Sequence, residues 1–317
     1  MNQIDDLLLR GLPVTLRQLQ VFLAVCAEEG FSRAGERLGL TQPAVSAQVR
    51  QLEKAVDRRL VEFVGRTLWL TPDGEALRDA ARDVLGRLDA LSMQLDEIRG
   101  SVRGPLRLAV VSSAQYFLPH LLAAFAVEHP GVEVRVHVAN RFAALERLDA
   151  NADDLAIMAL VPEERALELL PFLDNELHLV AAPDHRAAGA RELVELTDAC
   201  FLMRESGSGI RRALEDELDR RRVRPAGVME LGSTEAMREG ARAGLGVALL
   251  PRHAIHRDLA SGELVSIKVK GFPIRRSWCL VHARGKALNP AAERMKSFVQ
   301  AHLGELPALL DAVPFPR

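Results

Sequence analysis

The chain has 317 residues, of which 48% are hydrophobic and 26% are charged, with 41 lysines and arginines against 43 aspartates and glutamates. This composition is ordinary for a folded protein of two or three domains, and it excludes the disordered, collagen-like and small disulfide-bonded classes. The net charge of −2 provides no overall field that attracts nucleic acid or an anionic membrane, so a polyanionic partner would have to bind a local patch.

The N-terminus and the cysteines favour a cytoplasmic protein without a membrane partner. Residues 1–11 contain two aspartates and a run of only three leucines, unlike a signal peptide. No stretch approaches the roughly 20 apolar residues of a membrane span. Cys26, Cys200 and Cys279 are far apart and form no CxxC pair, which fits free, buried thiols in a reducing compartment.

The N-terminal segment begins with short helices separated by tight breaks. Apolar residues recur at helical spacing over 16–26, and a second helix is expected to open at Ser32, whose hydroxyl can cap it, and to end at Gly39. Thr41 can cap a third helix, with Pro43 in its first turn, where a missing N–H costs nothing. Two short helices around a glycine-containing break are typical of a helix-turn-helix.

A wing and a local positive charge follow this motif. Residues 60–70 form two β-prone runs around Gly65 and Arg66, the pattern of a hairpin. Residues 31–66 contain seven basic and four acidic side chains, an excess of three positive charges in a slightly acidic protein. Residues 12–71 therefore predict a winged helix-turn-helix whose arginines can neutralise DNA phosphates.

We expect eight side chains of this segment to contact double-stranded DNA. The start of the third helix would face base edges in the major groove. Gln42 and Gln48 can each donate to and accept from an adenine edge, and Arg50 can bind guanine or a phosphate. The full set is Arg33, Gln42, Pro43, Ser46, Gln48, Arg50, Arg58 and Arg66. The alternative is an ordinary solvated helix face.

Residues 72–103 predict a long linker helix followed by a hinge. Pro72 and Asp73 suit the first turn of a helix that Thr71 can cap. Apolar residues then alternate at spacings of four and three: Leu77, Ala81, Val84, Leu88, Leu91, Leu95 and Ile98. Because such a seam needs a partner helix, we expect a homodimer. The alternative is that the seam packs against other parts of the same chain.

From residue 104 the pattern alternates between strands and helices, which predicts an α/β fold with parallel strands and covering helices. The first series has strands at 106–111, 132–138 and 155–158 and helices at 117–128 and 142–150. The second has strands at 177–182, 200–203, 228–231 and 247–250 and helices at 209–222 and 234–243, before a strand at 278–282 and a helix at 290–303. We expect two lobes, formed by 104–174 with 281–303 and by 175–280. Residues 304–317 receive no assignment.

Polar side chains at the ends of these strands outline a cleft. Ser112 and Ser113 end the first strand, and Asn140 and Arg141 end the second, which are the positions where open α/β sheets bind ligands. Residues 206–209 read Ser-Gly-Ser-Gly between a strand and a helix, where backbone N–H groups and the helix start favour an anion. A structural turn is the alternative for this loop.

Signatures of catalysis are poor. The chain contains no GxSxG, Walker A or HExxH motif. His253 and His256 have no acid at the spacing that a metal site needs. We therefore expect that the protein is not an enzyme and that it has no metal site and no cofactor.

Over residues 15–303 the chain resembles the LysR-type transcriptional regulators. The stretch LRQLQVFLAVCAEEGFSRAGERLGLTQPAVSAQVRQLEKAVDRRLVEFVGRTLWLTPDGEAL carries that family's order of elements. The later part is most similar to regulators of carbon-fixation operons, in the motifs YFLPHLLAAFAVEHPGVEV at 116–134, NR at 140–141, DLAIM at 154–158, FLDN at 172–175, RESGSGIRRALE at 204–215 and GKALNPAA at 285–292.

The resemblance implies an α/β protein with a winged helix-turn-helix, a linker helix that pairs two subunits, and a two-lobed effector domain folded like type II periplasmic binding proteins. It implies a small metabolite between the lobes, a homotetramer of two dimers, and contact with RNA polymerase at the promoter. Carried onto this chain, the effector-binding residues are Ser112, Ser113, Gln115, Asn140, Arg141, Arg204, Ser206, Ser208, Arg211 and Thr234. Among these we expect Arg211 to be essential for the effector response.

Two departures from the carbon-fixation group bear on the effector. Gln115 stands where that group often has lysine, and Ala159 and Leu160 replace its usual Gly-Arg. An anionic effector is still expected, but two charges that suit sugar phosphates are missing. One alternative is a regulator of another pathway that responds to an aromatic or amino acid carboxylate. A second is a cytoplasmic binding protein or enzyme of the same α/β fold, which would leave the basic N-terminal segment without a role.

Overall fold

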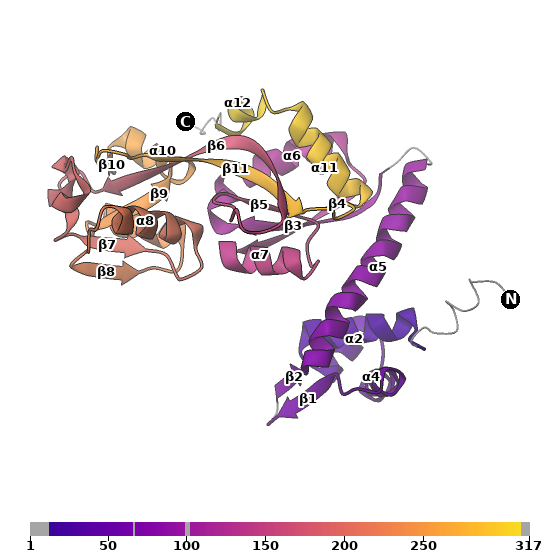
Figure 1. Cartoon of the computed structure of the whole chain (residues 1–317). Helices are drawn as coiled ribbons and strands as arrows, with labels where there is room; N and C mark the ends of the chain where they lie inside the picture. The colour runs from indigo at the N-terminus through magenta and orange to yellow at the C-terminus, as the bar shows by residue number, and fades with distance from the viewer. Residues whose placement is uncertain (1–12, 66, 99–101, 312–317) are drawn as a thin grey trace. The chain divides into compact units, whose positions relative to one another are not determined.

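The computed structural model describes residues 13–65, 67–98 and 102–311. It divides into two compact units, residues 1–92 and 93–317, whose boundary lies inside one long helix. Figure 1 labels the elements of both units. Arg66, predicted at the tip of the wing, lies outside the described residues.

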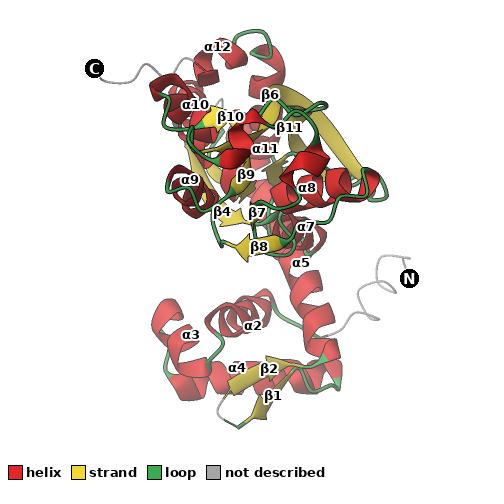
Figure 2. Ribbon diagram, turned by 90° about the vertical axis from the view of Figure 1, so that its left-hand side faces the viewer, coloured by secondary structure: helices red, strands yellow, loops and turns green. Residues whose placement is uncertain are grey.

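The first unit is a winged helix-turn-helix, as predicted. Its elements are α2 (Leu16–Glu28), α3 (Phe31–Leu38), α4 (Gln42–Val56), β1 (Val61–Val64), β2 (Thr67–Leu70) and the start of α5 (Pro72–Ile98). The two strands pair in antiparallel register, with Val61 opposite Leu70, and they form a hairpin beside the helices (Figure 2).

Local hydrogen bonds and backbone angles account for the ends of these helices. The Thr41 hydroxyl accepts a hydrogen bond from the backbone N–H of Ala44 at 3.4 Å and so begins α4, as predicted. Gly39 ends α3 at φ +64°, a left-handed conformation that favours glycine. The prediction for Ser32 is wrong: Gly30 is the N-cap of α3, and Ser32 lies inside the first helical turn rather than before it.

The core of the first unit fixes which side of α4 faces solvent. Val45, Val49 and Leu52 are at most 1% exposed and pack in one cluster with Phe22 and Val25 of α2. Three apolar residues on one side of a helix leave the opposite side for solvent or a partner. The hydrophobic pattern of this segment therefore positions the start of α4 on the surface.

The heptad seam of α5 is buried at one end and exposed at the other. Leu77 and Ala81 pack in the core of the first unit. The other five residues are between 41% and 83% exposed: Val84, Leu88, Leu91, Leu95 and Ile98. A row of large apolar side chains on a charged helix is costly in water, so it is suited to a second helix.

The second unit is built on one mixed sheet with the strand order β4-β3-β5-β11-β6-β9-β7-β8, while β10 pairs with β6. The strands are β3 (Gly104–Val111), β4 (Val132–Ala139), β5 (Leu155–Met158), β6 (Leu167–Ala181), β7 (Cys200–Met203), β8 (Gly227–Glu230), β9 (Val247–Pro251), β10 (Val265–Ser266) and β11 (Ile274–Ala283). The strand β3 is parallel to β4 and β5, and β7 is parallel to β8 and β9. The sequence missed the antiparallel pair β6 and β11, because β6 begins ten residues earlier than the expected strand, at Leu167.

Helices cover this sheet around a hydrophobic core in each lobe, and the core of the second lobe consists of two clusters of buried residues. They are α6 (Leu118–Glu128), α7 (Arg141–Asp149), α8 (Gly209–Arg220), α9 (Thr234–Arg242), α10 (Arg252–Ser261), α11 (Pro290–Ala301) and α12 (Leu306–Asp311), with a short 3-10 helix η1 (Ser112–Tyr116) after β3. Of these, α10 and α12 were not predicted. No helix in the described ranges is long and apolar enough to cross a membrane.

The long strands β6 and β11 run from one core to the other (Figure 1). On β6, Leu173 packs in the first core and Leu177 in the second. On β11, Ile274 packs in the second core and Trp278 in the first, so the change of lobe lies before residue 278 rather than at 280–281. Two lobes joined by a pair of strands can move relative to each other about those strands.

Candidate functional site

The first candidate site is the solvent side of α4. Gln42, Ser46 and Arg50 follow one another at four-residue spacing and so lie on one side of the helix, next to Pro43. Arg50 is exposed, and no hydrogen bond or ion pair links it to another described residue. The structure does not bring Gln48 to this side: it lies six residues from Gln42 and is half-buried.

Two other arginines expected in this site are held by backbone oxygens. The guanidinium of Arg33 donates to the carbonyls of Glu28 at 2.7 Å and Glu29 at 3.2 Å, at the carboxyl end of α2. Arg58 donates to the carbonyl of Asp57 at 2.8 Å. Both side chains stay exposed. Lys54, one turn beyond Arg50, is exposed as well, and it was not among the predicted contacts.

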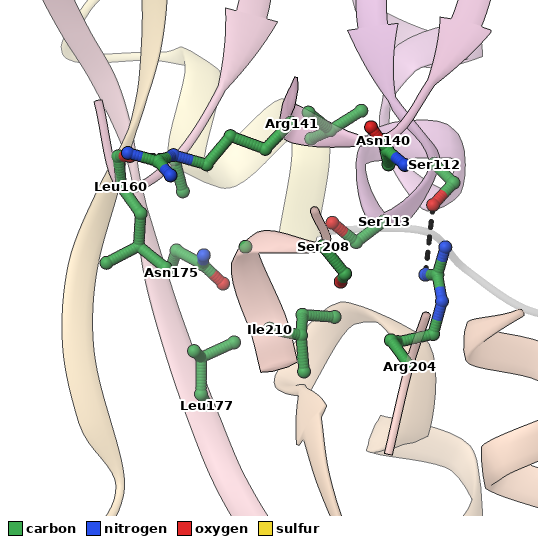
Figure 3. A pocket seen from close by; sticks show the side chains of 13 residues that line it. Ser112, Ser113, Asn140, Arg141, Leu160, Asn175, Leu177, Arg204, Ser208 and Ile210 are labelled. Atoms are coloured by element: carbon green, nitrogen blue, oxygen red, sulfur yellow. Dashed lines mark hydrogen bonds between the residues drawn. The ribbon is translucent and has the colours of Figure 1, made fainter. Parts of the chain in front are cut away.

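The second candidate site is a small cavity between the two lobes of the second unit (Figure 3). Its volume is about 30 Å³, room for about two water-sized groups. It is lined by Val111, Ser112, Ser113, Asn140, Arg141, Ala159, Leu160, Asn175, Leu177, Arg204, Ser208, Gly209 and Ile210. Six of the ten predicted effector residues are in this set, so the expected strand ends do converge.

The beginnings of two helices supply positive potential to the cavity. Asn140 caps α7, its side-chain oxygen accepting a hydrogen bond from Ala143 at 2.9 Å, and Ser208 stands before α8. Neither first turn contains an acidic residue. Free N–H groups and the helix dipole at such ends attract anions.

A glycine lets the loop before α8 approach α7 closely. Gly207 has φ +86°, and a Cβ there would lie 3.1 Å from the Cβ of Phe142. The Gly207 carbonyl also accepts a hydrogen bond from the Phe142 backbone N–H at 3.2 Å. The Ser-Gly-Ser-Gly sequence thus has a structural role as well as a place beside the cavity.

Arg141 brings a charge to the cavity that no acid pairs with. Its Nε donates to the carbonyl of Leu160 at 2.6 Å, and no hydrogen bond or ion pair joins it to a carboxylate among the described residues. Burial lowers the pKa of the Arg141 guanidinium below its ordinary value, although an arginine remains charged. Glu164 acts on this charge only through space, without a direct contact. A partly buried cation that no carboxylate contacts directly favours an anionic ligand.

Arg204 has a different role because its hydrogen bonds are satisfied within the protein. It is 4% exposed. Its Nη1 donates to the hydroxyls of Ser112 and Thr234, both at 3.0 Å, and its Nε and Nη2 donate to the Glu205 carboxylate at 2.7 and 2.8 Å. Since Ser112 follows β3 and Thr234 begins α9, Arg204 ties the two lobes together.

The structure does not bring Gln115, Ser206, Arg211 or Thr234 to the cavity wall. Gln115 and Ser206 are exposed outside it. Arg211 binds Glu215 at 2.7 Å and Glu230 at 2.6 Å, and hydrogen bonds to these glutamates raise its pKa. Two carboxylates neutralise this arginine, so we no longer expect it to hold an effector charge.

The sequence missed Asn175, which is 3% exposed and lies on the cavity wall. It stands on β6 two residues before Leu177, another lining residue, so the two share a face of the strand. Since residues 167–176 were not recognised as a strand, this alternation was hidden. The motif FLDN at 172–175 was the available signal.

Metal and thiol chemistry find no support in the described part of the chain. It contains no cluster of three or more His, Cys, Asp or Glu residues that could hold a metal ion. The ring of His253 packs on Phe117, with centroids 5.6 Å apart. Burial raises the pKa of the Cys26 thiol to about 11, which leaves it unreactive near neutral pH.

Both parts of the chain match models of one protein family. Residues 16–75 match the bacterial regulatory helix-turn-helix protein of the lysR family, and residues 99–304 match the LysR substrate binding domain. The chain belongs to the LysR family of bacterial regulators. The resemblance inferred from sequence is thereby confirmed, together with the winged helix-turn-helix and the α/β effector domain.

Two curated relatives and one solved structure resemble the chain over most of its length or over its second unit. The RuBisCO operon transcriptional regulator of Allochromatium vinosum is 40% identical over 288 residues, which cover 90% of this chain and 95% of that protein. The regulator CbbR of Rhodospirillum rubrum is 40% identical over 296 residues, covering 93% and 98%. The CcmR regulatory domain of Synechocystis, solved in complex with 2-PG, superposes with a TM-score of 0.60 at 37% identity, covering 65% of this chain and all of that one.

The two kinds of hydroxyl at this site should differ in their effect on stability. We expect Thr234→Val to lower the free energy of unfolding by about 1 kcal/mol, because it removes one acceptor from the buried Arg204. Ser208→Ala should change it by less than about 0.5 kcal/mol, since no hydrogen bond joins that hydroxyl to a described residue. Denaturation by urea measures both. Equal losses would mean that Ser208 has a structural partner.

Proposed function

We propose that this protein is an effector-responsive LysR-type regulator of a carbon-fixation operon, and that it acts by binding DNA rather than by catalysis. The observation that carries this proposal is the anion-attracting cavity in a chain that also has an exposed helix-turn-helix. The names of the relatives at 40% identity support the pathway. A regulator of another pathway would share the same fold, so the effector decides between the two.

Operator DNA binds to the solvent side of α4 in this proposal. Arg50 carries a free charge there, with Gln42, Pro43 and Ser46 beside it. An amide and a guanidinium on one side of a helix are suited to base edges in the major groove. We assign Arg33, Arg58 and Arg66 as phosphate contacts. Gln48, which is half-buried, receives no DNA contact in this proposal.

We expect Arg50→Ala to weaken operator binding by about 1 to 3 kcal/mol if the side chain reads a base. If Arg50 binds a phosphate instead, the loss of affinity should be similar on all DNA sequences. The slope of the logarithm of affinity against the logarithm of salt concentration should then become less steep by about one. Gel-shift titrations of the adjacent intergenic DNA at several salt concentrations separate these cases. The control is Arg220→Ala, which removes an exposed arginine of the second unit. Unchanged affinity of the Arg50 variant would remove Arg50 from the interface.

The effector in this proposal is a small phosphorylated carboxylate. Two helix beginnings and the unpaired Arg141 surround the cavity, and no carboxylate lines it. A solved relative at 37% identity carries 2-PG. Because the cavity measures only about 30 Å³, such an anion enters only when the lobes separate, so binding has to change the lobe arrangement.

Arg141→Gln should weaken binding of 2-phosphoglycolate by about 10- to 150-fold, the range for one hydrogen-bonded charge. The matched control is Arg211→Gln, which should bind normally because glutamates already neutralise that arginine. Isothermal titration calorimetry on the purified full chain measures both affinities. Wild-type-like binding by the Arg141 variant, or loss in the Arg211 variant alone, would contradict this assignment. Binding of plain aromatic or amino acid carboxylates but not of 2-phosphoglycolate would favour another pathway.

The exposed part of the α5 seam pairs two subunits in this proposal, and two such dimers join into a tetramer. Effector binding changes the angle between the lobes, and the tetramer changes its shape in response. The spacing of the DNA-binding units then changes, which alters the geometry of the promoter that RNA polymerase meets. This coupling needs the α5 seam, because the seam joins the DNA-binding units of two chains.

The double substitution Leu88→Glu and Leu95→Glu should abolish dimerisation through α5, since it places four charges in the paired seam. Sedimentation equilibrium should then show a lower oligomer than wild type. Gln94→Glu adds a charge beside the seam and should leave the assembly unchanged. Retention of the wild-type mass by the double variant would show that the seam packs elsewhere.

A further inference from the structure

Asn175 is a polar residue that the protein itself leaves without a partner. Its side chain is 3% exposed, and its Oδ1 is buried without a hydrogen bond. No hydrogen bond joins the amide nitrogen to a described residue either. A buried, unsatisfied amide is costly, and native structures rarely keep one without a reason.

The surroundings of Asn175 show where such a partner would come from. In Figure 3 the amide points into the pocket, near the apolar side chains of Leu160, Leu177 and Ile210. The anion-attracting groups, Arg141 and the start of α8, belong to the same lining. A ligand whose anionic group binds there presents another part of itself to Asn175.

The chemistry of the amide oxygen limits what that part can be. Oδ1 is an acceptor only, so it needs a donor hydrogen. An ionised phosphate or carboxylate has acceptors alone and cannot satisfy it. A hydroxyl can donate to Oδ1 and accept from the amide nitrogen at the same time.

From this geometry we propose that Asn175 selects effectors that carry a hydroxyl group beside their anionic group. The proposal rests on the proposed function, because it concerns the same cavity, and it adds a specificity-determining residue to it. Phosphorylated hydroxy acids then bind more tightly than phosphorylated acids without a hydroxyl, such as 2-phosphoglycolate, which still bind through their anionic groups. A site built to hydrogen-bond a hydroxyl discriminates against the analogue that lacks it.

Two matched pairs of probes test this selection. They are 2-phosphoglycerate with 2-phospholactate, and 3-phosphoglycerate with 3-phosphonooxypropanoate, each pair differing by one hydroxyl. We expect the wild-type full chain to bind the hydroxylated member of at least one pair about tenfold more tightly. Asn175→Leu, which keeps the shape but has no polar group, should bind both members equally well.

A second measurement separates selection from a structural role. Without ligand, Asn175→Leu should melt at the same temperature as wild type or higher, because it removes an unsatisfied buried amide from apolar surroundings. A clear fall in the melting temperature would show that the amide supports the fold and would overturn the proposal. Asn175→Asp keeps the acceptor but adds a negative charge, so it should weaken the binding of every probe.

The outcomes distinguish this proposal from the proposed function. If wild type binds both members of each pair equally, or if Asn175→Leu keeps the preference, the role proposed for Asn175 is wrong. The proposed anion site is not affected by that result. If no phosphorylated acid binds to wild type at all, the proposed effector class fails and this inference fails with it.

Discussion

An arginine that no carboxylate contacts, beside two helix beginnings, is the constraint on which the proposed effector response depends. Arg141 is partly buried, and no carboxylate in the described residues binds it. The starts of α7 and α8 add positive potential without acidic residues in their first turns. Such an arrangement favours an anionic ligand. In the proposed function, lobe position and effector charge are therefore linked by electrostatics.

In the proposed function, the fold converts this local charge into movement through the connections that join the two lobes. The strands β6 and β11 cross between the two cores. Arg204 ties Ser112 to Thr234, and the Tyr116 hydroxyl donates to the Glu235 carboxylate at 3.1 Å. These polar contacts between the lobes hold the cavity at its present small size. A bound anion has to compete with them, and this competition gives the ligand different affinities for the two lobe arrangements.

Regular patterns in the sequence predicted most of the fold. The helical spacing around Val45, Val49 and Leu52, and the apolar runs of β3, β5 and β9, each reflect burial on a periodic element, which local sequence reports well. The predicted N-cap at Ser32 was wrong because serine is also tolerated inside a first turn. The strand β6 was missed over residues 167–176 because Pro171 and charged residues interrupt its alternation.

Side-chain partners were harder to predict than element positions. Ser112, Asn140 and Arg141 were found because strand ends in α/β sheets meet at one edge. Arg211 looked equivalent in sequence to Arg204, but only the structure reveals that Glu230, nineteen residues away, takes its charge. Asn175 was missed because residues 167–176 were not recognised as a strand, so only the motif FLDN at 172–175 pointed to it.

Hydrogen–deuterium exchange of the full chain with and without 2-phosphoglycolate tests the central claim most directly, because it reports on backbone amides at the two helix starts. The account predicts that the anion slows exchange at residues 140–143 and 206–211 and alters exchange along β6 and β11, where the lobes join. Saturating anion that leaves both helix starts unchanged, or that protects only amides elsewhere, would contradict an anion site between the lobes.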